Sequence, residues 1–212
     1  MPDLTAQPNP LRRSIAATML LAPGLLLTND SLAQQQRRAT PSQTEGPYYP
    51  RSLPDDSDFD LLRNAQLTYT HGRAAWVEGV VSDLQGTPVR GAQVEIWQCD
   101  EAGHYHHPSD GARANPAFQG FGRVLVNDDG RYRFRTIRPA PYSGRTPHIH
   151  VKVKLSGRHL LTTQLYVQGD PGNARDTVWR SLADDTARAA VTVAFEPVSD
   201  GLRAFFPIVL AL

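Results

Sequence analysis

Two histidines separated by a single residue are the most informative positions for chemistry. His148 and His150 flank Ile149 in a run that alternates polar and apolar side chains as far as Leu155. Such alternation predicts a β-strand, in which side chains two positions apart share a face at about 6.6 Å, from a rise of about 3.3 Å per residue. Two imidazoles at that separation can bind one metal ion. A solvated strand face is the alternative interpretation, because lysines continue the same face.

Two tyrosines could complete such a metal site. Tyr142 stands six residues before His148, after a proline-rich segment, 138–141, which predicts an extended connection. Tyr105 lies in a histidine-rich loop after a predicted strand at 93–99. Taken singly, each tyrosine could equally be a structural residue with a hydrogen-bonded hydroxyl. A phenol becomes a metal ligand only when a strong cation lowers its pKa, normally about 10, and ferric iron does this better than zinc.

The elements that must position these residues are short strands. Runs rich in Val, Ile, Tyr and Phe, separated by Gly, Pro, Asp and Asn, occupy 74–82, 93–99, 123–126, 131–137, 148–155, 162–167, 191–195 and 206–211. Only 177–190 has a helical pattern. The sequence therefore predicts an all-β fold, an antiparallel β-sandwich with long loops and at most one or two short helices, over residues 71–212. Residues 34–70 lack periodicity and predict an extended N-terminal arm with loops.

The N-terminal 33 residues are expected to be a secretory signal. Arg12 and Arg13 precede a mainly apolar stretch at 15–27, and Ser31-Leu32-Ala33 supplies small residues before a cleavage point. Thirteen residues span only about 20 Å as a helix, too short for a membrane anchor. The paired arginines are compatible with twin-arginine export as well as with the general route. We therefore expect a periplasmic or extracellular protein without stable membrane insertion.

Composition excludes several classes of protein and of metal site. The 22 basic and 21 acidic side chains leave a formal charge of +1, which argues against a nucleic-acid binder. A single cysteine, Cys99, excludes an intrachain disulfide and a cysteine-rich metal cluster, and we expect it to be structural. A homo-oligomer is compatible with the sequence.

Several motifs, taken in order, resemble the intradiol ring-cleavage dioxygenases. They cover roughly residues 40–170 and are Trp97-Gln98, Gly103-His104-Tyr105, the run from Gly130 to Pro139, Pro141-Tyr142, Arg145, Pro147-His148-Ile149-His150 and Thr163-Gln164-Leu165-Tyr166. Within that family the chain is most similar to the iron-bearing subunit of the protocatechuate 3,4-dioxygenases. The resemblance implies an enzyme that cleaves a catechol-type ring with O2, between its two hydroxylated carbons, to a cis,cis-muconate.

The same resemblance assigns roles to individual residues. It implies a non-haem Fe(III) held by Tyr105, Tyr142, His148 and His150. Tyr142 also matches the tyrosine that leaves the metal and takes a proton from the catechol.

The resemblance extends to the residues around the substrate. Arg145 and Gln164 match catalytic positions that face the substrate, and Tyr48, in the loop 44–48, matches part of the substrate shelf.

Two other functions fit parts of the sequence. An exported, non-catalytic transthyretin-like β-sandwich binding module would also carry the stretch 79–92, but would have no need of all four candidate ligands. A zinc hydrolase built on His148 and His150 would require a third imidazole or a carboxylate.

Overall fold

The computed structural model describes residues 37–212. The predicted secretory signal at 1–33 lies outside these described residues. Within the described part, no helix is long and apolar enough to cross a bilayer.

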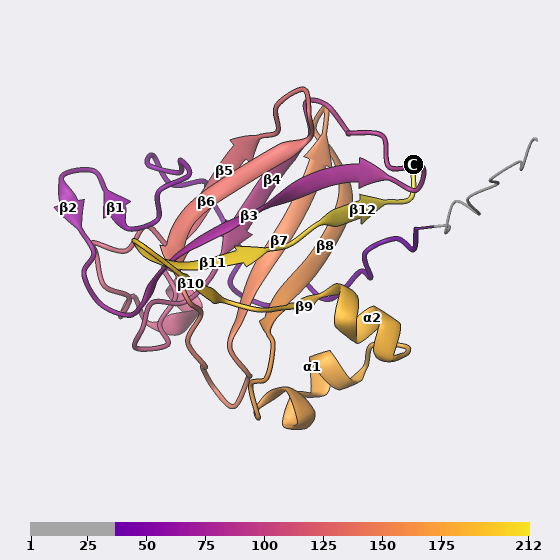
Figure 1. Ribbon diagram of the computed structural model, residues 1–212. Coiled ribbons are helices and arrows are strands. Elements are labelled where there is room, and N and C mark those ends of the chain that lie inside the picture. Colours follow the sequence, from indigo (N-terminus) through magenta and orange to yellow (C-terminus); the bar gives the residue numbers. More distant parts are fainter. Residues whose placement is uncertain (1–36) are drawn as a thin grey trace, which may run out of the picture. The chain divides into compact units, whose positions relative to one another are not determined.

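Two five-stranded sheets form the layers of the fold (Figure 1). The first sheet, in spatial order, contains β5 (Phe121–Leu125), β4 (Gln93–Trp97), β7 (His148–Leu155), β8 (Arg158–Val167) and β9 (Thr192–Val193). The second sheet contains β10 (Glu196–Val198), β11 (Gly201–Phe205), β3 (Ala74–Asp83), β6 (Arg131–Ile137) and β12 (Ile208–Leu210). In this sheet β10 pairs with β11, and β3 pairs with β11, β6 and β12. The predicted all-β sandwich is therefore confirmed.

The remaining elements are short. β1 (Arg63–Asn64) and β2 (Leu67–Thr68) form a separate small hairpin, and η1 (Pro108–Asp110) and η2 (Asn173–Arg175) are 3-10 turns. The predicted helical segment at 177–190 forms two helices, α1 (Thr177–Arg180) and α2 (Asp185–Ala190), which lie beside β9 in Figure 1. It divides because the Asp184 side chain accepts a hydrogen bond from the Ala187 amide and so begins a new helix.

Strand pairing near the C-terminus differs from a purely antiparallel sandwich. β11 and β12 both run parallel to β3, and β9 runs parallel to β8. Parallel neighbours need a crossover connection, and α1 and α2 supply it between β8 and β9. The sequence pattern missed β10 and β11, because Pro197 and Gly201 interrupt the periodicity on which strand prediction depends.

The hydrophobic core lies between the sheets. In β6 the aromatic side chains of Tyr132 and Phe134 are buried, whereas Arg131 and Arg133 on the opposite face are exposed. In β7, Ile149, Val151 and Val153 point into the same core. A second, smaller buried cluster is built around Trp97, Cys99, Tyr105, Phe121 and Ala140.

Cys99 belongs to this second cluster. Its thiol is buried and donates to the carbonyl oxygen of Ala140 at 3.5 Å. Burial raises its pKa to about 12, so the thiol stays protonated at neutral pH, in keeping with a structural residue.

Replacing Phe134 by alanine should destabilise the sandwich strongly. Its ring is fully buried in the core, and deleting it leaves a cavity, so we expect a loss of about 3–5 kcal/mol in unfolding free energy. Chemical denaturation measures this loss. Leu125→Ala is the matched control, because Leu125 is 72% exposed and should change stability little. Equal losses for the two variants would contradict the core assignment.

Candidate metal centre

His148 and His150 lie on the face of β7 that points away from the main core, as the alternation predicts. Both are nevertheless buried, with exposures of 1% and 0%. The rings of Trp97 and His150 are parallel and stack at 4.8 Å between centroids, and Gln164 is the cross-strand partner of His150 on β8. The alternative of a solvated histidine face is therefore wrong.

The two imidazoles point at a common position. His148 Nε2 lies 3.2 Å from His150 Nε2, and His148 Nδ1 lies 2.6 Å from the Thr146 carbonyl oxygen. When Nδ1 donates to that carbonyl, Nε2 carries a free lone pair. Two nitrogens bound to one ion at about 2.1 Å and at a right angle lie about 3 Å apart, close to the separation found here.

Burial and charge keep both rings neutral. Burial, with a contribution from the nearby Arg145 guanidinium, lowers the pKa of His148 to about 4. Burial and the neighbouring His148 lower the pKa of His150 well below its usual value. Neutral imidazoles are the form that binds metal ions.

Tyr142 reaches the histidines through a tight turn. Ser143 and Gly144 have φ angles of 43° and 76°, and the Arg145 amide donates to the Tyr142 carbonyl at 2.7 Å. Left-handed φ at both central residues is the pattern of a two-residue type I′ turn, for which Ser-Gly is suitable. The turn brings Tyr142 and Arg145 side by side, and Tyr142 Oη lies 3.5 Å from His148 Nε2.

Tyr105 approaches from the loop after β4. Asp110 accepts from its backbone amide at 2.9 Å, and Asp100 accepts from the amides of Ala102 and His104, so two carboxylates shape the loop. The Tyr105 ring stands edge-on to Tyr142 with centroids 4.9 Å apart. Its hydroxyl is buried and has no hydrogen-bond partner among the described residues.

Burial raises the pKa of both phenols. The pKa of Tyr105 lies well above its usual value, although Arg145 opposes this shift. The pKa of the half-buried Tyr142 is also raised, although the neighbouring Tyr105 hydroxyl and Arg145 oppose that shift. Phenolates at these positions therefore need a strong compensating cation.

The N-terminal segment covers this face of the sheet. From here on, the word arm means residues 40–49 alone, a part of the segment 34–70. Tyr48 stacks on Tyr105 at 4.5 Å and meets Tyr142 edge-on at 5.8 Å. A side chain at Gly46 would place its Cβ 3.2 Å from the His150 ring, so glycine permits the close approach. The arm is what makes the histidine face a buried one.

Charged side chains hold the arm in place. Lys152, on the same face of β7 as the histidines, forms an ion pair with Glu45, and its Nζ lies 3.5 Å from the centre of the Tyr49 ring. Lys154 donates both to buried Glu95, at 2.8 Å, and to the Tyr49 hydroxyl, at 3.0 Å. The Tyr49 hydroxyl donates in turn to Glu95. Both lysines that continue the histidine face therefore contact the arm.

Arg145 and Gln164 form a polar group beside the histidines. Arg145 Nη2 donates to Gln164 Oε1 at 2.7 Å, and Gln164 Nε2 donates to the Thr44 carbonyl at 3.0 Å. Asp176 binds Arg145 through Nε at 2.7 Å. Arginine, glutamine and arm thus form one hydrogen-bonded chain.

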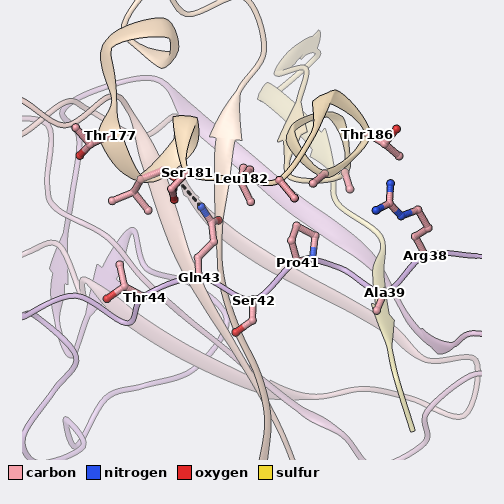
Figure 2. A pocket seen from close by; sticks show the side chains of 14 residues that line it. Arg38, Ala39, Pro41, Ser42, Gln43, Thr44, Thr177, Ser181, Leu182 and Thr186 are labelled. Carbon is pink, nitrogen blue, oxygen red and sulfur yellow. Dashed lines mark hydrogen bonds between the residues drawn. The ribbon is translucent and has the colours of Figure 1, made fainter.

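A pocket of about 660 Å³ lies between residues 38–44 and the two helices (Figure 2). Figure 2 shows Gln43 extending from the arm toward α1, where its Nε2 donates to the Val178 carbonyl at 3.4 Å. Gln43 Nε2 also donates to the Tyr166 hydroxyl. None of the four candidate ligands lines this pocket.

The structure brings all the predicted site residues into one region. Tyr105, Tyr142, His148 and His150 converge, Tyr48 packs over them, and Arg145 and Gln164 lie alongside. Sequence reasoning missed the contacts of Asp176. Asp176 precedes a short helical pattern and could have been found as a helix cap, but its contact with a side chain 31 positions earlier could not.

The donor set fits a hard, highly charged metal ion. Two neutral imidazoles and two phenols, one of which is the unpartnered buried Tyr105 hydroxyl, could together hold one cation. Within residues 37–212, no three or more His, Cys, Asp or Glu side chains gather in the way that a zinc hydrolase built on these histidines would require.

Known proteins similar to this chain are dioxygenases. The family model described as Dioxygenase (Dioxygenase_C) matches residues 44–211. Catechol 1,2-dioxygenase of Candida albicans is 33% identical over 196 residues, covering 82% of this chain and 59% of the relative. The protocatechuate 3,4-dioxygenase beta chain of Burkholderia cepacia is 39% identical over 138 residues, covering 60% of this chain and 59% of the relative. The matched region is thus about three fifths of the length of each relative.

A solved structure matches over nearly its whole length. It is the dioxygenase domain of a dioxygenase carbohydrate-binding protein fusion from Streptomyces sp. SirexAA-E, with a TM-score of 0.66 and 32% identity, and the match covers 82% of this chain and 99% of that one. These comparisons lend no support to a non-catalytic binding module. On the extent of the family match and on these relatives, the chain belongs to the intradiol ring-cleavage dioxygenase family.

Proposed function

We propose that this protein is a non-haem Fe(III)-dependent intradiol dioxygenase that cleaves a catechol-type ring between its hydroxylated carbons. Both atoms of O2 enter the product, a cis,cis-muconate. The observation that carries the proposal is the convergence of two phenols and two neutral imidazoles in one buried site, with His148 Nε2 and His150 Nε2 3.2 Å apart. The family relationship supports the class of reaction.

Tyr105, Tyr142, His148 and His150 would hold the iron. When bound, ferric iron would take the two catechol oxygens as ligands and make the ring reactive toward O2. Two phenolates offset two of the three positive charges, and the imidazoles add nitrogen ligands without charge. Stacking of Trp97 on His150 fixes the plane of that ring.

Tyr142 is proposed as the base that accepts a proton from the catechol. It is the less buried of the two phenols and stands on an exposed two-residue turn, so its side chain has room to move. Tyr105 is held by an ordered loop and by the stacked Tyr48 ring. The proton would therefore be taken up at Tyr142 Oη rather than at Tyr105.

Arg145 and Gln164 are proposed to stabilise negative charge on the substrate. Asp176 binds Nε and Nη2 of Arg145, and Gln164 also accepts a hydrogen bond from Nη2. The guanidinium is thus oriented before substrate arrives, which favours electrostatic catalysis. Tyr48 would form one wall of the substrate site through its contacts with both tyrosines.

Purified protein should contain about one iron per chain and absorb visible light through phenolate-to-Fe(III) charge transfer. His150→Ala should lose most of the iron, because it removes one of the four proposed ligands. Metal analysis and absorption spectra measure both effects. Tyr142→Phe should retain some iron but change the band. The exposed His71 provides the control, since His71→Ala should leave iron and colour intact. Unchanged spectra in both site variants would refute the ligand assignment.

Catechols should be consumed together with O2 in a one-to-one ratio. With ¹⁸O2, the muconate should carry two labelled atoms, one in each new carboxyl group. Screening catechol, protocatechuate, hydroxyquinol and larger lignin-derived catechols would identify the substrate.

Arg145→Ala should lower kcat by roughly 10²–10³-fold, by analogy with loss of one oriented donor. Arg158→Ala, at the exposed start of β8, should have little effect. A product cleaved outside the two hydroxylated carbons would overturn the proposal.

We also propose that the protein is exported, on the strength of residues 1–33. The mature chain should then begin at Gln34, as N-terminal sequencing of the periplasmic or secreted protein would show. Replacing Arg12 and Arg13 with lysine should block export by the twin-arginine route and leave general secretion working. Uncleaved protein confined to the cytoplasm would refute this part of the proposal.

A further inference from the structure

Asp176 is a buried carboxylate that enters the proposed reaction only through its contact with Arg145. Its side chain has no exposed surface, and it accepts hydrogen bonds from five groups. Two of them are Arg145 Nε at 2.7 Å and Arg145 Nη2 at 3.4 Å. The others are the amides of Thr146 at 3.0 Å, Val178 at 3.0 Å and Trp179 at 2.9 Å. One carboxylate thus joins the turn that carries Arg145 to the first turn of α1.

The turn alone does not determine where the Arg145 guanidinium lies. Ser143 and Gly144 are exposed, and a long arginine side chain loses rotamer entropy when it is fixed. A charged partner that binds Nε as well as one terminal nitrogen determines both the position and the plane of the guanidinium. Asp176 supplies such a partner, and Gln164 Oε1 receives the other bond of Nη2.

The contact between Asp176 and Arg145 is linked to the arm through Gln164. Gln164 Oε1 accepts from Arg145 and from the Tyr166 hydroxyl, while Gln164 Nε2 donates to the Thr44 carbonyl. With its oxygen occupied by two donors, the Gln164 amide has a defined orientation. A shift of the guanidinium would therefore disturb the glutamine and the arm that covers the histidines.

We propose that Asp176 is a positioning residue, which holds the Arg145 guanidinium beside Gln164 and so presents it to a bound catechol. This inference rests on the proposed function for its effect on catalysis, but not for the contact itself. A role as helix cap alone is the competing explanation, because Asp176 also accepts from the first amides of α1.

Asp176→Asn separates the two explanations. Asparagine caps helices about as well as aspartate, so the variant keeps the cap while removing the charge that binds the guanidinium. Asp184→Asn is the matched control. Asp184 caps α2 through the Ala187 amide and pairs with the exposed Arg38, and it has no contact with Arg145.

The first measurement is independent of turnover. In protein purified without iron, NMR of arginine Nε–H groups should show one slowly exchanging signal that disappears in Arg145→Lys and is thereby assigned. We expect that signal to be lost in Asp176→Asn and kept in Asp184→Asn. Persistence of the protected signal in Asp176→Asn would overturn the proposal.

The second measurement is kinetic. In iron-loaded enzyme, Asp176→Asn should lower kcat roughly 10- to 100-fold, the scale expected for misplacing one catalytic group. The visible absorption band should not change, and Asp184→Asn should stay within about twofold of the parent. In an Arg145→Lys background, Asp176→Asn should have little further effect, because the group it positions is already gone. Equal kcat for the two asparagine variants, or fully additive losses in the double variant, would refute positioning.

If Asp176→Asn does not fold, Asp176→Glu keeps the charge but moves the carboxylate by one methylene, and an intermediate kcat with an altered Nε–H signal is expected. Parental values for Asp176→Glu on both measurements would count against the proposal. If no form of the protein consumes a catechol, the proposed function fails, and the NMR measurement alone decides whether Asp176 holds Arg145.

Discussion

Two neutral imidazoles buried with their Nε2 atoms 3.2 Å apart set the central constraint on this molecule. His148 directs Nδ1 at a backbone carbonyl, which leaves its Nε2 lone pair facing its neighbour. Burial lowers the pKa of both rings, so neither gains a proton that would link them as a cation at neutral pH. With the unpartnered Tyr105 hydroxyl close by, the site has more electron-pair donors than protein groups to receive them. The proposed iron would satisfy all of them together.

The surrounding structure keeps water away from these donors. Trp97 stacks on one imidazole, Tyr48 covers Tyr105, and Gly46 lies against His150. The arm that carries Tyr48 and Gly46 has little secondary structure of its own. It is held by the ion pair between Lys152 and Glu45 and by the hydrogen bond from Lys154 to the Tyr49 hydroxyl. Electrostatic interactions inside such a site are stronger than in water, because the local dielectric constant is lower. The lysine contacts therefore contribute to the chemistry indirectly, by keeping the arm closed over the site.

The sandwich uses the two faces of its first sheet for different purposes. Ile149, Val151 and Val153 pack in the main core, and the alternate positions on the same strand carry the imidazoles and the lysines. A strand anchored on one face by apolar packing is a rigid base for ligands on the other. The Ser143-Gly144 turn and the arm lie outside the sheet and are attached to this base by hydrogen bonds and ion pairs. The two imidazoles are thus fixed on a strand, whereas Tyr142 stands on a loop, in keeping with the proposed proton transfer at Tyr142.

Strand limits, the direction of side chains along each strand and the fold class could all be read from the sequence. The period of two in 131–137 and 148–155 predicted both strands at their observed limits and placed His148 and His150 on one face, because side-chain direction in a strand depends only on backbone geometry. The all-β class followed from many short apolar runs and turn residues.

Contacts between segments far apart in the chain could be seen only in the folded structure. It showed that the histidine face is covered, that Lys152 binds Glu45, and that Asp176 binds Arg145 across 31 positions. It also decided the parallel pairing of β11 and β12 with β3. These features depend on packing between segments far apart in the chain, and the energy of such contacts exceeds the weak local preferences from which a sequence pattern is read.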